Sequence, residues 1–198
     1  MTVIYISGKA RHGKDTVATF MQAQFEKDGL RTHITHYGDL VKFVAEKWAG
    51  WNGEKDEPGR RLLQYVGTDL IRAEAPGYWV AFVAQMAHFF SDEYDVLLIP
   101  DCRFPDELLW APGYAVRVER TGPNGEPFDN GLSEAAKNHA SETSLDDYPF
   151  RYVVHNDGGL TKLNAESAKL AAQIARYLPG AGAGPQARTR ARTEGSCT

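Results

Sequence analysis

The chain has 198 residues, of which 42% are hydrophobic and 24% are charged, which is enough for one globular domain with a sizeable core. Its net charge of -4 argues against a nucleic-acid partner and against a membrane-surface protein. Two cysteines are too few for a disulfide framework, and no apolar run approaches the ~20 residues that span a membrane, so we expect a cytoplasmic protein.

Strands and helices are predicted to alternate along the chain. The apolar, β-branched run at residues 2–7 predicts a strand, and the apolar spacing in residues 14–28 predicts a helix directly after it. The apolar run at residues 95–101, which ends in an acid, is typical of a central parallel strand. The other predictions are strands at residues 32–37, 114–120 and 151–156 and helices at residues 40–48, 60–73, 79–90 and 160–178. This order predicts a three-layer α/β fold in which helices flank a mostly parallel, five-stranded sheet.

Two segments lack the periodicity of helices and strands. Residues 120–147 are polar and contain several glycines, and a long irregular segment inside a compact domain is usually either a functional lid or a disordered loop. Residues 179–198 are rich in Gly, Ala, Pro and spaced arginines, so they cannot bury apolar surface and are expected to form a disordered tail. A single folded domain is therefore expected over residues 1–178.

The segment "GKARHGKDT", between the first predicted strand and helix, matches a phosphate-binding loop. Gly8, Gly13 and Lys14 fit G-x-x-x-x-G-K, whose glycines let successive backbone N–H groups turn toward an anion at the start of the helix. Lys14 would reach the β- and γ-phosphates of ATP, and Lys9 and Arg11 would add positive potential. The alternative is a glycine-containing turn that binds no ligand.

Asp15 stands where such loops usually have Ser or Thr, and Thr16 follows one position later. A carboxylate beside bound triphosphate would be repelled unless a metal ion or a basic group lies between them. Asp15 is therefore a candidate ligand of Mg²⁺ or a residue that orders nearby cations. The alternative is that Asp15 only interacts with the helix dipole, which is worth ~0.3–1 kcal/mol without any function. Thr16 can still offer its hydroxyl group to a phosphate oxygen.

A second candidate group follows the apolar strand in "LLIPDCRFPDEL". Asp101, at the end of the strand, is predicted to hold Mg²⁺ directly or through water. Arg103 would point the same way and could bind a phosphoryl group in a bidentate manner. In the alternative interpretation, Asp101 caps the following turn and Arg103 pairs with Asp106 or Glu107. Cys102 is interpreted as a small buried filler.

Further polar residues are candidates for the acceptor side of a site and for a lid. Gln64, Thr68 and Arg72 share one helical face at i, i+4, i+8 spacing, so this stripe faces either a cleft or solvent. A phosphorylated acceptor needs a cation opposite the phosphate loop, and Arg72 is the candidate. Lids over phosphoryl-transfer sites carry cations that neutralise charge. The candidates for that role are Arg117, Arg120 and Lys137.

The sequence resembles the bacteriophage-type deoxynucleoside monophosphate kinases, which are P-loop kinases. Six motifs carry the resemblance, in this order along the chain: "SGKARHGKDT", "YGDLVKFVAEKWAG", "LLQYVGTDLIR", "DCRFPDE", "NHASE" and "NDGGL". The resemblance runs from Val3 to about Leu163, and GKDT and DCRFPDE are its specific parts. It implies transfer of the ATP γ-phosphate to a 2′-deoxynucleoside 5′-monophosphate with Mg²⁺, giving a diphosphate and ADP. It also implies an adenylate-kinase-like core, an acceptor-binding helical region at about residues 39–91 and a lid at about residues 120–147.

Carried over by position, the resemblance also implies site roles and partners. The ATP phosphates would be held by Gly8, Lys9, Arg11, His12, Gly13, Lys14, Asp15 and Thr16. The acceptor would be bound by Gln64, Arg72, Asp101 and Arg103, the catalytic residues would be Lys14, Asp15, Arg72 and Arg103, and Mg²⁺ would lie at Asp15 and Asp101. The family suggests a homodimer and, for a phage-encoded protein, the host cytoplasm. Ala140 stands where related sequences more often have a proline.

An acceptor phosphate is already an anionic nucleophile, so in-line transfer would need no strong general base and would depend on positioning and charge neutralisation. Two other interpretations stay open. One is a kinase of another small phosphorylated acceptor, of the phosphomevalonate or dephospho-coenzyme-A type. The other is a nucleotide-binding module that binds ATP without acceptor-dependent release of ADP.

Overall fold

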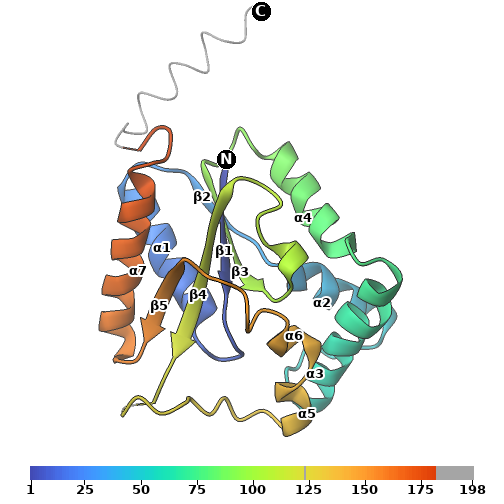
Figure 1. The fold of residues 1–198 in the computed structure, drawn as a ribbon. Helices are drawn as coiled ribbons and strands as arrows, with labels where there is room; N and C mark the ends of the chain where they lie inside the picture. The colour runs from blue at the N-terminus through green and yellow to red at the C-terminus, as the bar shows by residue number, and fades with distance from the viewer. Residues whose placement is uncertain (123, 182–198) are drawn as a thin grey trace, which may run out of the picture.

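The computed structural model describes residues 1–122 and 124–181. Its centre is a five-stranded sheet in the order β2-β3-β1-β4-β5, in which each pair of neighbouring strands is parallel (Figure 1). The predicted α/β class and the five-stranded sheet are confirmed. The strands are β1 (Thr2–Ser7), β2 (Thr32–Ile34), β3 (Val96–Cys102), β4 (Gly113–Arg120) and β5 (Tyr152–Asn156).

Helices cover both faces of the sheet and complete the three layers (Figure 1). On one face lie α1 (Lys14–Lys27) and α7 (Gly159–Ala175), and on the other lie α2 (Tyr37–Trp48) and α4 (Tyr78–Phe89). Next to α2, α3 (Glu57–Gln64) continues directly into a π-helix, η1 (Tyr65–Arg72). The short helices are η2 (Pro105–Glu107), α5 (Glu134–Lys137) and α6 (Ala140–Thr143).

The two-residue alternation of β1 decides which side chains enter which layer. Ile4 and Ile6 pack with the residues of α1 and α7, whereas Val3 and Tyr5 pack with those of α2 and α4. All four side chains are buried, as is Phe25 of α1. Because both faces of a parallel sheet are covered, its central strand is apolar throughout, which is the pattern that the sequence shows.

The strand predicted at residues 32–37 is shorter in the structure. Pairing with β3 stops at Ile34, and His36 occupies the N-cap position of α2. The two histidines of this segment therefore do not share one strand, because only His33 lies on β2.

The helix predicted at residues 60–73 also differs in its bounds and its geometry. It begins at Glu57, because the side chain of Asp56 accepts the backbone N–H of Gly59 at 2.8 Å and caps the helix. Its second half is wound as a π-helix, a form that is often found at functional sites. The tail predicted at residues 179–198 lies, from residue 182 onward, outside the described residues.

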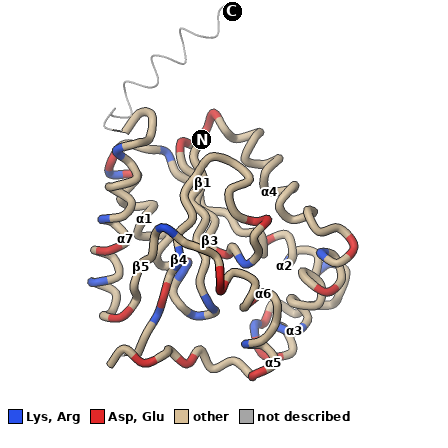
Figure 2. Tube along the Cα trace, viewed as in Figure 1, with Lys and Arg blue, Asp and Glu red and all other residues tan. Residues whose placement is uncertain are grey.

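The carboxyl ends of the parallel strands meet at one edge of the sheet, where ligands bind in folds of this class. Charged residues cluster at this edge, whereas the sequence of α4 contains no Lys, Arg, Asp or Glu (Figure 2). Among the described residues, no helix combines the length and the apolar character needed to cross a bilayer. The segments that follow β1, β3, β4 and β5 are therefore the place to search for a site.

We expect Phe25→Ala to lower the free energy of unfolding by about 3–5 kcal/mol, because it empties a fully buried position between α1 and the sheet. Equilibrium unfolding in urea measures this loss. The control is Phe43→Ala on α2, where the side chain is 53% exposed and the loss should stay below about 1 kcal/mol. Equal losses in the two variants would contradict the packing described here.

Candidate active site

The loop at residues 8–13 joins β1 to α1 and has the form of an anion-binding turn. Gly13 occupies the N-cap position of α1 with a φ of 96°, in the left-handed region that favours glycine. At Gly8, a Cβ atom would lie 2.5 Å from the carbonyl oxygen of Val118, so glycine is required there too. Within the described residues, no side chain caps the start of α1, which leaves the first backbone N–H groups of this helix for an anion.

Lys14, the first residue of α1, folds its side chain back over this loop. Its ammonium group donates to the carbonyl oxygens of Gly8 at 2.8 Å and Lys9 at 2.9 Å. Burial lowers the pKa of Lys14 to about 8, and the nearby Arg103 guanidinium adds to this effect. A phosphate group beside Lys14 would favour its charged form, so this lysine is suited to an anionic ligand.

The loop lies between two cavities. The first cavity has a volume of about 570 Å³, is bordered by α2, α3 and η1, and includes Lys14 and Asp15 in its lining. The second cavity has a volume of about 550 Å³ and is bordered by Gly13 and Thr16 together with the ends of β4 and β5. Neighbouring residues of one loop therefore face two different cavities, so that two ligands can meet at the loop.

Asp15 is held by a histidine that the sequence analysis did not connect with it. Its Oδ1 atom lies 2.8 Å from Nε2 of His36, whose Nδ1 atom lies 3.3 Å from Oδ2 of Asp39. The hydrogen bond between Asp15 and His36 lowers the pKa of the carboxyl group and raises the pKa of the imidazole. Both shifts favour the pair of an imidazolium and a carboxylate beside the phosphate loop.

Asp101 lies at the end of β3 and lines the first cavity. Its two oxygens accept the backbone N–H groups of Tyr37 at 3.0 Å and Gly38 at 2.8 Å, so it caps the start of α2 rather than the turn that follows β3. Burial raises the pKa of Asp101, although the two backbone bonds favour its ionised form. The carboxylate has lone pairs beyond those that accept these two bonds.

The described residues contain no group of three or more His, Cys, Asp and Glu side chains that could hold a metal ion. Mg²⁺ bound with a nucleotide uses one or two carboxylates, several waters and the phosphates rather than a protein cage. Asp15 and Asp101 both line the first cavity and are carboxylates with unused lone pairs, so they fit that kind of site.

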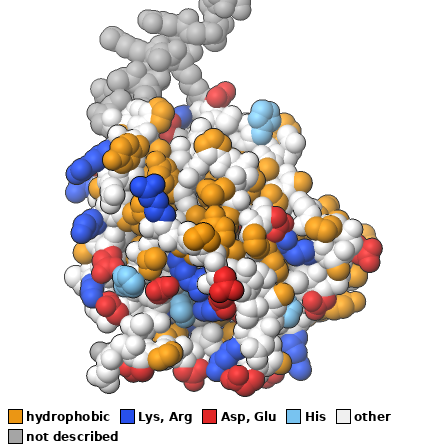
Figure 3. All heavy atoms as spheres, in the orientation of Figure 1, with side chains coloured by type: hydrophobic (Ala, Val, Ile, Leu, Met, Phe, Trp, Pro, Cys, Tyr) orange, Lys and Arg blue, Asp and Glu red, His pale blue; other side chains and the backbone are white. Residues whose placement is uncertain are grey.

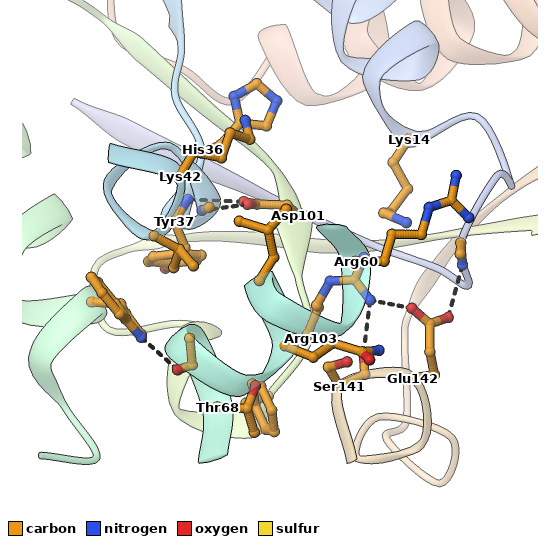
Figure 4. A pocket seen from close by; sticks show the side chains of 18 of the residues that line it. Lys14, His36, Tyr37, Lys42, Arg60, Thr68, Asp101, Arg103, Ser141 and Glu142 are labelled. Carbon is orange, nitrogen blue, oxygen red and sulfur yellow. Dashed lines mark hydrogen bonds and ion pairs between the residues drawn. The ribbon is translucent and has the colours of Figure 1, made fainter. Parts of the chain in front are cut away.

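A buried carboxylate joins the phosphate loop to the segment after β4. Glu142 accepts the backbone N–H of Ala10 at 2.9 Å with Oε2, and its Oε1 accepts a short hydrogen bond from Arg103 (Figure 4). Arg103 also donates to the carbonyl oxygen of Ser141 at 3.0 Å. The predicted alternative partners of Arg103, Asp106 and Glu107, are thus not its ion-pair partners. The carboxylate of Glu142 occupies an anion position at the loop.

Arg72 lies at the end of η1 and is already surrounded by acids. It donates to both oxygens of Asp106 at 2.8 Å and pairs with Glu107, and its guanidinium stacks 3.9 Å from the ring centre of Phe104. Its side chain is 12% exposed. Although Arg72 lines the first cavity as predicted, its charge is largely neutralised by the turn that follows β3.

The predicted stripe of Gln64, Thr68 and Arg72 faces the first cavity, not solvent. The π-helix has more residues per turn than an α-helix, so residues four apart still fall close to one face. Tyr37, Trp79 and Phe104 add aromatic surface to the same cavity. The wall thus combines polar groups with flat apolar rings.

The other predicted loop cations are used to hold neighbouring segments. Lys9 pairs with Asp146, and Nη1 of Arg11 donates to the carbonyl oxygen of Asn130 at 2.7 Å. His12 lies over β4, where its Nδ1 atom accepts the backbone N–H of Arg120 at 3.2 Å. A carboxylate thus offsets the charge of Lys9 in the structure, and the expected contact of Lys9 and Arg11 with ATP stays a prediction.

The three predicted lid cations lie in three different environments. Arg117 is on β4 and donates to the carbonyl oxygen of Leu145 at 2.8 Å, away from both cavities. Arg120, at the end of β4, lines the second cavity and stacks 3.9 Å from the ring centre of Phe128. Lys137 pairs with Glu134 on the surface of α5. The structure therefore does not bring these three cations together at the first cavity.

His36 and Glu142 are the residues at the loop whose contacts the sequence analysis missed. His36 is 21 residues from Asp15, and Glu142 is 132 residues from Ala10, so no local spacing links either pair. The unusual Asp15 in the loop was a signal that a cation must lie close to it. Around the site, basic and acidic side chains are interspersed on the surface (Figure 3).

No protein-family model and no curated protein matches the chain. Among solved structures, it is similar to a dephospho-CoA kinase from Campylobacter jejuni, with 11% sequence identity and a TM-score of 0.50. The match covers 87% of this chain and 97% of that chain. At this identity the likeness shows only that the two chains share a fold.

We expect a favourable coupling between Asp15 and His36 only in a limited pH range. The raised pKa of His36 gives stability below its ordinary value of 6.5 that is lost as the pH rises through the folded value. The lowered pKa of Asp15 gives stability above its ordinary value of 3.8 that is lost as the pH falls through the folded value. The coupling should therefore be present near pH 5.5 and vanish near pH 9.

A double-mutant cycle of Asp15→Asn and His36→Asn, followed by urea unfolding at both pH values, measures this coupling. We expect a coupling free energy of at most about 1 kcal/mol between the two side chains at pH 5.5, because the Asp15 side chain is largely exposed. The control is His33→Asn, which removes the histidine of β2 and should be additive with Asp15→Asn at both pH values. A coupling of equal size at pH 9 would contradict the charged pair.

Proposed function

We propose that this protein is a deoxynucleoside monophosphate kinase that transfers the γ-phosphate of ATP to a 2′-deoxynucleoside 5′-monophosphate, giving a diphosphate and ADP. The observation that carries the proposal is the uncapped start of α1 with buried Lys14, placed between two cavities. One anion-binding loop with a cavity on each side suits a reaction in which a phosphoryl group passes between two ligands.

The second cavity is the candidate site for the adenosine half of ATP. It adjoins Gly13 and Thr16 and contains the stacked side chains of Arg120 and Phe128. From there the phosphates would reach the N-terminus of α1 and Lys14, which faces the first cavity. Asp15 and Asp101 would hold Mg²⁺, which supplies neutralisation of charge on the β- and γ-phosphates when it is bound.

The first cavity is the candidate site for the acceptor. Its wall offers Gln64 and Thr68 as hydrogen-bonding groups beside the aromatic side chains of Tyr37, Trp79 and Phe104, a combination that suits a nucleobase. We assign residues 39–91 to acceptor binding because this cavity is bordered by α2, α3 and η1. We assign the segment after β4, up to residue 147, to the lid because Glu142 and Asn130 bind the phosphate loop.

Four carboxylates line the first cavity, and a donor group engages each of them. Asp15 is held by His36, Asp101 by two backbone N–H groups, and Glu142 by Arg103 and a backbone N–H. Glu107 accepts two backbone N–H groups and pairs with Arg72. Each carboxylate thus has a donor that offsets part of its charge and lessens its repulsion of a phosphate acceptor, and in-line transfer to a phosphate needs no general base.

Catalysis in this proposal comes from positioning and electrostatics. Lys14 would hold the donor phosphates at the loop, and Arg103 would approach the transferred group from β3. Arg103 is held by Glu142 and Ser141, so its guanidinium is already oriented when ligands arrive. The segment after β4 covers the loop and would exclude water from the transferred group.

A kinase of dephospho-coenzyme A is the second candidate, since the similar solved structure carries that name. The two functions differ in the acceptor that stimulates release of ADP. We therefore expect ATP and Mg²⁺ to give ADP release with at least one 2′-deoxynucleoside 5′-monophosphate, tested beside ribonucleoside monophosphates and dephospho-coenzyme A. Release with dephospho-coenzyme A alone would favour the second candidate, and ATP binding without acceptor-dependent release would indicate a binding module.

We expect Lys14→Met to lower kcat by at least about a hundredfold, because one preorganised charge at the transferred phosphate is lost. Thermal unfolding should not shift to lower temperature, since the variant removes a buried charge that burial already disfavours. The control is Lys27→Met, at the exposed end of the same helix, which should keep wild-type turnover. Normal turnover of Lys14→Met would remove Lys14 from the reaction.

A further inference from the structure

Arg60 of α3 lines the first cavity beside the phosphate loop, and it was not among the residues that the sequence analysis assigned to the site. Its guanidinium uses Nε to donate to the carbonyl oxygen of Lys55 at 2.9 Å. Within residues 1–122 and 124–181, this is its one side-chain hydrogen bond, and it makes no ion pair with a carboxylate. Its two terminal NH₂ groups therefore keep their full capacity to donate.

The other strong cations around the cavity are already compensated. Arg72 pairs with Asp106 and Glu107, and Arg103 pairs with Glu142. The carboxylate beside each of them already offsets part of its positive charge, so it attracts a second anion less strongly than an unpaired arginine does. Arg60 has no carboxylate partner among the described residues, so its charge is not offset in this way.

Besides Lys14, which is assigned to the donor phosphates, two further cations of the cavity form no ion pair with an acid among the described residues, and both are less suitable for the acceptor. Arg11 belongs to the phosphate loop, and its Nη1 group already donates a hydrogen bond to the carbonyl oxygen of Asn130. Lys55 precedes α3, is exposed and presents a single ammonium group, which water and salt screen. Arg60 is half-buried and offers a planar fork that matches two phosphate oxygens.

The position of Arg60 is fixed by its helix. Asp56 caps the start of α3, and the bond to Lys55 holds the guanidinium against the chain that precedes the helix. Arg60, Gln64 and Thr68 follow one another at four-residue spacing, and all three line the first cavity. In Figure 4 the labelled side chains of Arg60, Lys14 and Arg103 surround this cavity and come from three different segments of the chain. Arg60 thus extends the stripe of Gln64, Thr68 and Arg72 by one member, so that the stripe has an arginine at each end.

We propose that Arg60 binds the 5′-phosphate of the acceptor and that Arg72 is a positioning residue that holds the turn after β3. In this arrangement the rest of the acceptor lies along Gln64 and Thr68. The assignment rests on the function proposed above, because it takes the first cavity as the acceptor site. It moves the predicted phosphate contact from Arg72, which is paired with two acids, to Arg60, which has no acid partner among the described residues.

The kinetic test compares Arg60→Ala, Arg60→Lys and the control Arg61→Ala, which removes the neighbouring, exposed arginine that does not line the cavity. The acceptor is the deoxynucleoside monophosphate that the wild-type protein turns over fastest. We expect Arg60→Ala to raise the KM of this acceptor by about ten- to a hundredfold while the KM of ATP changes less than about twofold. Arg60→Lys should fall between these values, and Arg61→Ala should match the wild type.

Calorimetry without ATP separates a phosphate contact from general damage. The probes are the same monophosphate and its parent deoxynucleoside. Wild-type protein should bind the monophosphate more tightly, and Arg60→Ala should lose this preference while its affinity for the parent nucleoside stays the same. The same comparison with Arg72→Ala should keep the preference.

Three results would overturn the assignment of Arg60. They are an unchanged acceptor KM in Arg60→Ala, an equal rise in the KM of ATP, and an equal loss of affinity for nucleoside and nucleotide. If the wild-type protein phosphorylates an acceptor and Arg60→Ala behaves like Arg61→Ala, only this assignment fails. If the wild-type protein neither binds nor phosphorylates any monophosphate, the proposed function fails, and the assignment fails with it.

Discussion

The burial of positive charge at the start of α1 is the constraint on which the site depends. Lys14 is 8% exposed, and its pKa is lowered by burial and by the guanidinium of Arg103. Two cations this close together in a buried place require compensation. Carbonyl oxygens of the loop supply it for Lys14, and Glu142 supplies it for Arg103.

This compensation also explains why the segment after β4 folds against the loop. Glu142 binds Arg103 and the N–H of Ala10, and Asp146 binds Lys9. Glu142 and Asp146, both in the segment after β4, thus make three contacts with the phosphate loop and Arg103. The acids hold the segment over the start of α1, which is the position that a lid over a phosphoryl-transfer site would take.

Much of the fold could be predicted from the sequence because its signals are local. The apolar run of β1 and the two glycines of the loop indicated the strand, the turn and the helix that follows, and the structure has all three. The contacts of Asp15 and Arg103 could not be predicted, since their partners His36 and Glu142 lie on other segments. Sheet topology decides which segments meet, and a spacing rule within one helix or strand does not contain that information.

Local spacing in the sequence also could not predict which arginine of the helical stretch would be free to bind a phosphate. Residues 60 to 72 form one continuous helical stretch, so spacing alone could not say which arginine faces an unpaired environment. Asp106 and Glu107, which follow β3, neutralise Arg72, whereas no described carboxylate pairs with Arg60. In the proposed assignment, acids more than thirty residues away in the chain decide which arginine can meet a phosphate.

Phosphorus NMR of a reaction with ATP, Mg²⁺ and the preferred deoxynucleoside monophosphate tests the central claim most directly, because it identifies the group that accepts the phosphoryl. The account predicts that the monophosphate signal of the acceptor decays while the coupled signals of a phosphoanhydride grow, matched by formation of ADP. An unchanged acceptor monophosphate signal, with the γ-phosphate recovered as a new phosphomonoester or as inorganic phosphate, would contradict it.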